Sequence, residues 1–385
     1  MKQLAARVSE IDTTIFATMS DLALRTGSVN LGQGFPDTDG PDEVREAAVA
    51  ALRAGRNQYA PGTGVPELRR AVADHQRHWY GMELDPDSEV VVTTGATEAV
   101  AAALLALVDP GDEVIVLEPY YDSYPAGIAL AGGVRRAVPL RQADFRLDVG
   151  ALQAAVTPRT TAILLNTPHN PTGTVLDPAE LAAVARIAVE HDLLVISDEV
   201  YEHLVFDGRS HVPIATLPGM AERTLTVSSA GKTFSFTGWK VGWAVGPAPL
   251  VQAVTKAKQF LTYTSGAPLQ PAIAIALGLP EGYYADAASS LQARRDQLCA
   301  GLAKLGLEVR VPEGTYFATT DVRALGADDG MQFCLDLPAR AGVVAIPHSV
   351  FADDPETGRS LVRWAFCKRP EVLDEALDRL HRAYG

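Results

Sequence analysis

Short runs of apolar, mostly β-branched residues alternate along the first three quarters of the chain with alanine-rich stretches of helical periodicity. Nearly continuous apolar runs are typical of strands that are buried on both faces of a sheet. We predict such strands at 89–94, 113–118, 160–166, 193–198, 224–229 and 241–247. Helical stretches such as 96–107 and 178–191 lie between them, as crossover connections require. The pattern therefore predicts an α/β fold with a mainly parallel sheet flanked by helices.

The pattern changes after Pro280. A long charged helix is predicted over 285–306, followed by short strands within 308–320, 342–348 and 361–368 and a closing helix over 370–384. This mixture is typical of a smaller α+β domain. The first 44 residues are rich in Gly, Pro and Asp, and we expect them to pack on this smaller domain or on a neighbouring chain. The predicted organisation is a large domain over 45–280, with 1–44 and 281–385 forming an N-terminal arm and small domain.

Polar residues follow four of the predicted strands. They are Gly95-Ala96-Thr97 after the first strand, 167–173 after the third, Asp198 to Tyr201 after the fourth, and Ala230-Gly231-Lys232 after the fifth. In an open parallel sheet, ligands bind outside the carboxyl ends of the strands. We therefore expect these four segments to build one site.

Composition and charge narrow the classes of function. A chain of 385 residues, 47% hydrophobic and 21% charged, is long enough to bury a sizeable core, and its net charge of -14 disfavours nucleic acid and membrane surfaces as partners. The three cysteines and eight histidines show no metal-ligand spacing, so neither a disulfide framework nor a metal site is indicated. The start lacks the apolar segment of a secretory signal, and the longest apolar run, 99–108, is too short to cross a bilayer. We expect a cytoplasmic protein.

The tripeptide Gly231-Lys232-Thr233 repeats the end of the phosphate loop GxxxxGK[ST]. The first glycine of that motif falls on Thr226, so the backbone cradle is missing and a nucleotide-binding protein is disfavoured. A lysine and an aspartate at neighbouring strand ends suit another chemistry. Pyridoxal phosphate needs a lysine that forms a Schiff base with its aldehyde, a carboxylate beside its pyridine nitrogen, and an anion pocket for its phosphate.

Three motifs, NTPHNPTG (166–173), SDEVYEHL (197–204) and SSAGKTFSFTGWKVGW (228–243), resemble those of the class I and II aminotransferases, which have the type I pyridoxal-phosphate fold. Five further stretches resemble the group that contains N-succinyldiaminopimelate, kynurenine, glutamine and methionine aminotransferases; they are 13–23, 29–37, 57–64, 111–124 and 361–368. The resemblance implies pyridoxal 5′-phosphate as cofactor, a small-molecule amino acid and a 2-oxo acid as substrates, and a homodimer with shared active sites.

By this resemblance Lys232 bonds covalently to the cofactor and then moves the proton at the substrate's Cα. Asp198 pairs with the pyridine nitrogen, and Tyr201 and Asn170 contact the neighbouring ring oxygen. Tyr121 stacks on the ring. The phosphate is held by Gly95, Ala96, Thr97, Ser229 and Lys240. The commonest family pattern has arginine where this chain has Lys240, which supplies charge without a bidentate fork.

The remaining implied roles concern the substrate and the partner chain. Arg363 binds the substrate α-carboxylate, with Gly34 and Asn170 beside it. Tyr59 reaches the phosphate of the cofactor in the neighbouring subunit. Phe35 and Tyr263 are candidates for side-chain specificity.

The implied reaction is a ping-pong transfer of an amino group, with N-succinyl-LL-diaminopimelate as favoured donor and 2-oxoglutarate as acceptor. Methionine, glutamine or aromatic donors of the kynurenine type are the alternative substrates, and β-elimination from cysteine S-conjugates is the alternative reaction. A silent cofactor-binding regulator would need a basic DNA-binding segment, and the N-terminal arm is too short and too acidic for one.

Overall fold

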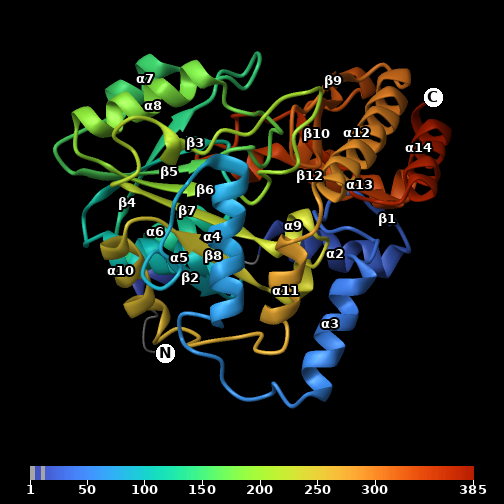
Figure 1. Ribbon diagram of the computed structural model, residues 1–385. Coiled ribbons are helices and arrows are strands. Elements are labelled where there is room, and N and C mark those ends of the chain that lie inside the picture. The colour runs from blue at the N-terminus through green and yellow to red at the C-terminus, as the bar shows by residue number, and fades with distance from the viewer. Residues whose placement is uncertain (1–4, 10–13) are drawn as a thin grey trace.

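A seven-stranded sheet with strand order β2-β8-β7-β6-β5-β3-β4 forms the centre of the structure, a computed structural model that describes residues 5–9 and 14–385 (Figure 1). Its strands are β2 (Val90–Thr93), β3 (Glu113–Glu118), β4 (Val134–Pro139), β5 (Thr160–Asn166), β6 (Leu194–Asp198), β7 (Thr224–Ser229) and β8 (Gly242–Val245). Strand β8 runs antiparallel to both of its neighbours, whereas the pairs β7-β6, β6-β5, β5-β3 and β3-β4 are parallel.

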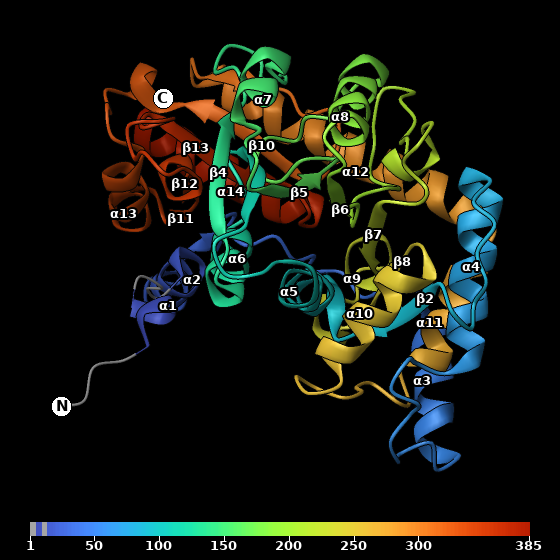
Figure 2. The ribbon, with the colours of Figure 1, turned by 90° about the vertical axis from the view of Figure 1, so that its left-hand side faces the viewer.

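Helices cover both faces of this sheet (Figure 2). One face carries α5 (Gly95–Leu107), α6 (Ser123–Ala131) and α10 (Ala248–Lys258). The other face carries α7 (Val149–Ala155) and α8 (Pro178–Glu190), and farther along α3 (Asp42–Arg53), α4 (Pro66–Tyr80) and α11 (Gln270–Leu277). Along β3, Val114 and Val116 pack into the first layer, whereas Ile115 and Leu117 pack into the second. This double burial explains why the strands read as continuous apolar runs.

Side-chain hydrogen bonds to the backbone determine where helix α8 begins. The Asp177 carboxylate accepts hydrogen bonds from the backbone N–H groups of Ala179 and Glu180, at 2.8 and 2.9 Å, and Glu180 reaches back to the N–H of Asp177. Together with Pro178 at the first helical position, this capping box begins α8. The helix then returns the chain to the start of β6, next to β5.

The C-terminal part builds a four-stranded antiparallel sheet of order β12-β13-β10-β9. Its strands are β9 (Glu308–Arg310), β10 (Phe317–Asp321), β12 (Ile346–Pro347) and β13 (Leu361–Ala365), and its helices are α12 (Glu281–Lys304), α13 (Gly330–Ala341) and α14 (Pro370–Tyr384). Short elements connect the rest: α1 (Ala6–Ser9), α9 (Ala230–Thr233), η1 (Ile214–Thr216), η2 (Thr237–Trp239), η3 (Val322–Leu325) and η4 (His348–Phe351).

The N-terminal arm packs on this C-terminal part. Strand β1 (Val29–Asn30) pairs in parallel with β11 (Val343–Val344), and α2 (Ile15–Thr26) buries Met19 in the same apolar cluster as Trp364. This packing supports the predicted association of 1–44 with 281–385. The division into two domains at these boundaries stays a prediction.

The predicted α/β architecture is confirmed, with two differences in detail. Strand β4 was not predicted, because its sequence VRRAVP includes two arginines and lies at the sheet edge, where only Val138 is buried. Strand β8 was expected as one more strand, and its reversed direction has no signal in the apolar pattern.

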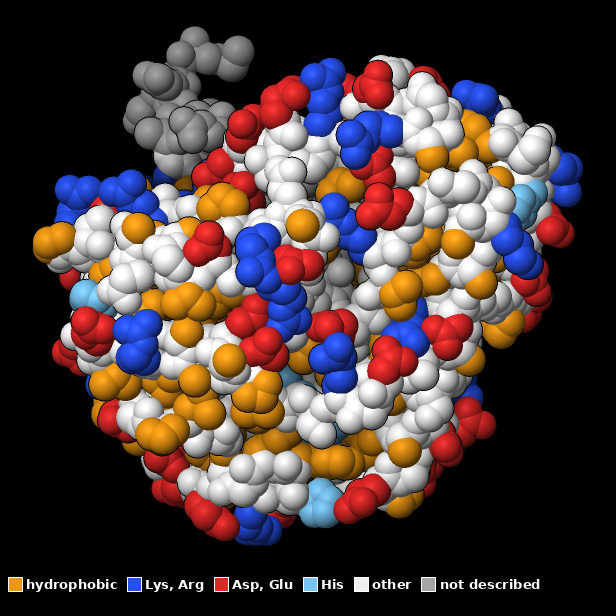
Figure 3. Space-filling view, turned by 90° about the horizontal axis from the view of Figure 1, so that it is seen from above, with side chains coloured by type: hydrophobic (Ala, Val, Ile, Leu, Met, Phe, Trp, Pro, Cys, Tyr) orange, Lys and Arg blue, Asp and Glu red, His pale blue; other side chains and the backbone are white. Residues whose placement is uncertain are grey.

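None of the helices within 5–9 and 14–385 combines the length and apolarity needed to span a membrane. On the face shown in Figure 3, acidic and basic side chains are interspersed, so the net charge of -14 is not gathered into a single patch there.

Candidate active site

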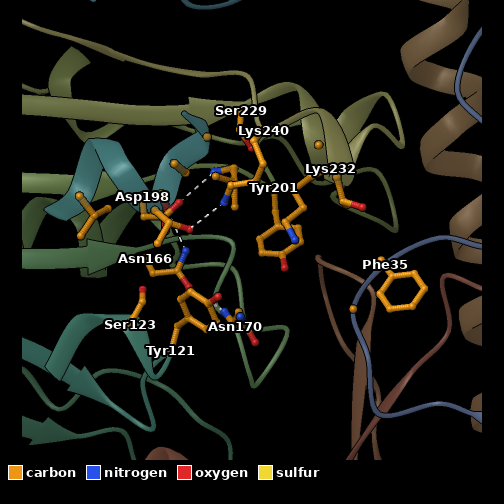
Figure 4. A pocket seen from close by; sticks show the side chains of 18 of the residues that line it. Phe35, Tyr121, Ser123, Asn166, Asn170, Asp198, Tyr201, Ser229, Lys232 and Lys240 are labelled. Carbon is orange, nitrogen blue, oxygen red and sulfur yellow. Dashed lines mark hydrogen bonds between the residues drawn. The ribbon is translucent and has the colours of Figure 1, made fainter. Parts of the chain in front are cut away.

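A cavity of about 290 Å³ opens at the carboxyl ends of β5, β6 and β7, where the large sheet meets the C-terminal part (Figure 4). It is lined by most of the predicted site residues, namely Gly34, Gly95, Ala96, Thr97, Tyr121, Asn170, Asp198, Tyr201, Ser229, Lys232, Lys240 and Arg363. Residues from all four segments expected at the strand ends line the cavity, as their convergence predicts, and Gly34 and Arg363 join them from positions more than 300 residues apart.

Lys232 enters this cavity from α9, the short helix that follows β7. Its Nζ donates a hydrogen bond to the Tyr316 hydroxyl at 2.9 Å, and that hydroxyl in turn donates to the carbonyl oxygen of Gly34. Burial lowers the pKa of Lys232 from its ordinary value of 10.5 to about 8. A sizeable fraction of neutral amine is therefore available near neutral pH, which nucleophilic and proton-transfer chemistry requires.

Asp198, the last residue of β6, is a buried carboxylate that faces the same cavity. The Tyr124 hydroxyl donates to its Oδ2 at 2.8 Å, and the amide of Asn166 donates to its backbone oxygen at 2.8 Å. Burial raises the pKa of Asp198 from 3.8 to about 6 in spite of the Tyr124 hydrogen bond. No lysine or arginine among the described residues forms an ion pair with it, so a cationic ring nitrogen would complete this carboxylate.

Burial of the charged Asp198 side chain lowers the free energy of unfolding. Because its folded-state pKa lies above its unfolded value, the folded state binds the proton more tightly, and stability falls as the pH rises from 3.8 to about 6. The shift corresponds to about 3 kcal/mol. We expect Asp198→Asn to remove this fall, so that the cofactor-free variant is more stable than the wild type at pH 7.

Urea unfolding of the cofactor-free proteins across pH 3.5 to about 7.5 measures this difference. Asp286→Asn, on the exposed surface of α12, is the matched control and should follow the wild type at every pH. Parallel curves for the wild type and Asp198→Asn would contradict a raised pKa at Asp198.

One end of the cavity is basic. The ammonium of Lys240 lies 3.4 Å from the Thr97 hydroxyl, close to the first turn of α5, and Ser229 lines the cavity nearby. Gly95 has a positive φ of 71°, and a Cβ at Gly242 would lie 2.6 Å from the carbonyl carbon of Gly95. Strand β8 therefore approaches the start of α5 closely. Free N–H groups at a helix start, a hydroxyl and an ammonium suit a phosphate group.

Arg363 on β13 forms the other charged wall and is 1% exposed. Its Nη1 donates to the side-chain oxygen of Asn170 at 2.8 Å and its Nη2 donates to the carbonyl of Gly32 at 3.0 Å. Its buried Nε has no partner, and its guanidinium stacks on Phe317 at 3.9 Å. Burial lowers the pKa of Arg363 to about 10. The described contacts of this cation are all to neutral groups, which leaves its charge available for an anionic ligand.

Tyr201 and Tyr121 supply aromatic surface. Tyr201 is 2% exposed, and its ring centroid lies 5.5 Å from the Lys232 ammonium. Tyr121 lines the cavity opposite the basic end, beside Asn170 (Figure 4). Burial raises the pKa of both phenols, so each hydroxyl remains a hydrogen-bond donor at neutral pH.

Gly34 lies in the cavity wall for a reason that the sequence did not indicate. A Cβ at this position would approach the Phe317 ring to 2.5 Å, so a larger residue would displace that ring from Arg363. Phe35 next to it is 45% exposed and lies at the cavity rim, where the Lys368 ammonium contacts its ring at 4.2 Å.

Two of the selected residues lie away from the cavity of their own chain. Tyr59 is 85% exposed and packs edge-on against Tyr263, with ring centroids 5.7 Å apart. Neither lines the cavity within the described chain. The predicted role of Tyr59 in a neighbouring subunit stays a prediction.

Several site residues escaped sequence reasoning. Tyr124 and Asn166 position Asp198, and Tyr316 contacts Lys232. A signal existed for Asn166, which ends a predicted strand. Tyr124 and Tyr316 read as ordinary buried aromatic residues, since a phenol's partner depends on tertiary structure.

Comparisons with known proteins indicate the family of this chain. The family model for aminotransferase class I and II matches residues 26–380. The probable N-succinyldiaminopimelate aminotransferase DapC of Mycobacterium tuberculosis is 54% identical, with 97% of each chain covered. A solved structure of N-succinyldiaminopimelate aminotransferase from the same organism superposes with a TM-score of 0.97 over 99% of this chain and 100% of that one. The methionine aminotransferase of Escherichia coli is 42% identical, with 98% of this chain and 97% of that protein covered.

Proposed function

Because this chain belongs to the class I and II aminotransferase family, we propose that its cavity binds pyridoxal 5′-phosphate and transfers the amino group of N-succinyl-LL-diaminopimelate to 2-oxoglutarate. Members of this family use that cofactor and act on amino acids and 2-oxo acids. The observation that carries the proposal is the buried guanidinium of Arg363, unpaired by any described carboxylate, across the same cavity from the lowered-pKa amine of Lys232.

The residues around the cavity fit the cofactor group by group. Asp198, a buried carboxylate without a cationic partner in the described chain, would keep a proton on the ring nitrogen. Tyr201 and Asn170 would donate hydrogen bonds to the ring oxygen, and Tyr121 would pack against the ring face. The phosphate would rest at the start of α5; the residues that would hold it are Gly95, Ala96, Thr97, Ser229 and Lys240.

When bound, pyridoxal phosphate supplies an electrophilic carbon and a ring that withdraws electron density from the substrate's Cα. Lys232 then has two tasks. Its amine would hold the cofactor and, once the substrate amine has displaced it, would take up and release the proton at the substrate's Cα. With a pKa of about 8, the amine can both accept and release a proton near neutral pH.

Arg363 would bind the α-carboxylate of either substrate through its planar fork, with Asn170 and Gly34 beside it. The favoured donor carries further carboxylates beyond the reacting carbon. The described cations that line the cavity are Lys232, Lys240 and Arg363, each assigned above, so the distal carboxylates require groups at the rim or from a second subunit. A contribution from a second subunit would agree with the predicted homodimer with shared sites.

A panel of amino donors tests the substrate. The half-reaction of the cofactor-loaded protein is followed by its absorbance change with N-succinyl-LL-diaminopimelate, methionine, glutamine and kynurenine. We expect kcat/KM for the first to exceed the others by about tenfold or more. A preference for methionine would replace the proposed substrate by that of the E. coli relative. Sustained pyruvate release from a cysteine S-conjugate without an oxo acid would favour the lyase alternative.

A hybrid dimer tests the role of Tyr59. If Tyr59 serves the partner's site, a Tyr59→Ala chain paired with a Lys232→Ala chain contains one intact site, because Lys232 and Tyr59 of that site come from different chains. Random mixing of the two inactive or weakened proteins should then restore about a quarter of wild-type activity. Pairing Lys232→Ala with Tyr384→Ala, a change on the distant helix α14, is the reference for dilution: Tyr384→Ala is active by itself, so this mixture should retain about half of wild-type activity. If hybrid dimers form and the first mixture is no more active than the sum of its two components, Tyr59 lies outside the partner's site.

A further inference from the structure

A second group of ionisable residues lies on the other side of the strands that carry the cavity. It consists of His75 on α4 and the adjacent pair Glu202 and His203, which follows β6, and we call it the His75–Glu202–His203 cluster. Helix α4 crosses in front of the sheet near β6 and β7 (Figure 1). The three potential ligand atoms lie within 4.8 Å of one another, and the Nε2 atoms of His75 and His203 are 2.8 Å apart.

The carboxylate of this cluster lacks a cationic partner. Glu202 is 4% exposed, and its Oε1 accepts a hydrogen bond from the Ser228 hydroxyl at 2.6 Å. None of the lysines and arginines within the described ranges forms an ion pair with it. A buried carboxylate is costly, even with hydroxyl partners, unless a positive charge or a metal compensates it. The nearby imidazoles are the available compensating groups, and their Nε2 atoms converge beside it.

The setting has the features of an open metal site. Glu202 and His203 line a second cavity of about 550 Å³, whose walls include Trp79, Tyr80 and Tyr284. This cavity gives solvent and ions a route to the cluster and room for a water ligand. Two imidazole nitrogens, one carboxylate oxygen and a water form a common four-coordinate set for Zn²⁺. Hydroxyl groups orient this carboxylate: Ser228 donates to Oε1, and the side chain of Tyr80 is a second hydrogen-bond partner of Glu202.

We propose that His75, Glu202 and His203 form a binding site for a divalent transition-metal ion, best suited to Zn²⁺, with water from the second cavity as the fourth ligand. The site is separate from the aminotransferase chemistry, and its existence does not depend on the proposed substrate. The cluster is connected to the proposed cofactor cavity through the backbone. Glu202 directly follows Tyr201 in the sequence, and Ser228 directly precedes Ser229. An ion here would brace the two strand ends that carry those residues.

The spacing rules used on the sequence do not detect this set. Two ligands are consecutive, and His75 lies 128 positions before His203, on a helix that reaches them only through the fold. The competing arrangement is a hydrogen bond between two imidazoles, which the 2.8 Å separation satisfies as it stands. A tetrahedral zinc site would need these nitrogens about half an ångström farther apart, given Zn–N distances of about 2.0 Å.

Zinc titration of the cofactor-loaded protein, stripped with a chelator and followed by calorimetry, tests the proposal. We expect one ion per chain for the wild type. His75→Ala and His203→Gln should each weaken binding by about 100-fold or more, because each removes one of three protein ligands. His191→Ala, which removes an exposed histidine at the end of α8, is the matched control and should bind as the wild type does.

X-ray absorption of the zinc-loaded wild type provides a readout that needs no variant. Two imidazole ligands per zinc are expected, and fewer than two would overturn the proposed ligand set. Absence of zinc binding by the wild type, or equal binding by properly folded cluster variants, would overturn the site and leave the imidazole hydrogen bond as the correct description. Transaminase activity enters none of these measurements, so their failure is distinct from failure of the proposed reaction.

Discussion

Lys232→Ala is expected to lower the turnover of amino-group transfer by more than about 10⁴-fold, because the proposed mechanism gives one side chain both the covalent bond to the cofactor and the proton transfer. The other amine that lines the cavity, Lys240, lies beside Thr97 at the basic end. Steady-state turnover and the single half-reaction should fall together. The absorbance band of a protonated imine should also be lost from the cofactor-loaded protein.

Small amines give this experiment a second readout. Alanine leaves a space where the lysine side chain was, and added methylamine or ethylamine should restore part of the proton-transfer rate in proportion to amine concentration. Lys256→Ala, an exposed lysine on α10, is the control and should match the wild type. Turnover of Lys232→Ala within tenfold of the wild type would remove Lys232 from the chemistry.

Arg363→Gln is expected to reduce kcat/KM for every amino donor by about 10²- to 10³-fold, mainly through a higher KM, since it removes a desolvated charge pair with the α-carboxylate. The kcat/KM of Arg363→Lys should lie between those of Arg363→Gln and the wild type, because lysine keeps the charge without the planar fork. Half-reaction rates measured against donor concentration separate KM from kcat. The cofactor absorbance should remain that of the wild type.

Arg340→Gln is a matched control for this change. Arg340 also stacks on an aromatic ring, that of Tyr384 at 4.2 Å, but it is exposed and far from the cavity. Its replacement should leave kcat/KM unchanged. If Arg363→Gln lowered kcat with an unchanged KM, or released the cofactor, Arg363 would have a role other than binding the substrate carboxylate.

The sequence predicted the fold class and most of the cavity because both depend on local patterns. Continuous apolar runs indicate strands that are buried on both faces, and polar residues directly after those runs mark the edge of the sheet where the cavity lies. Gly95, Asp198 and Lys232 could be predicted from the sequence in this way. The family resemblance of the motifs is confirmed by the match over residues 26–380. Roles assigned to single residues within the cavity stay predictions.

Contacts between segments that are distant in the sequence could not be predicted from it. Tyr316 meets Lys232 across 84 positions, and nothing in the composition of 313–317 distinguishes it from a core aromatic residue. The requirement for glycine at position 34 comes from a ring 283 positions away. The close packing of β8 against α5 follows from strand pairing, which an apolar run does not specify.

The reversed direction of β8 has a consequence for how this protein can evolve. Because β8 begins at the edge where β7 ends, Ser229, Lys232 and Lys240 all come from the short segment that joins these strands, so three of the proposed cofactor contacts are held together locally. The proposed substrate contacts come instead from the N-terminal arm and from β13. On these proposed assignments, substitutions at Phe35 and its surroundings can change the preferred amino acid without altering the residues proposed to bind the cofactor.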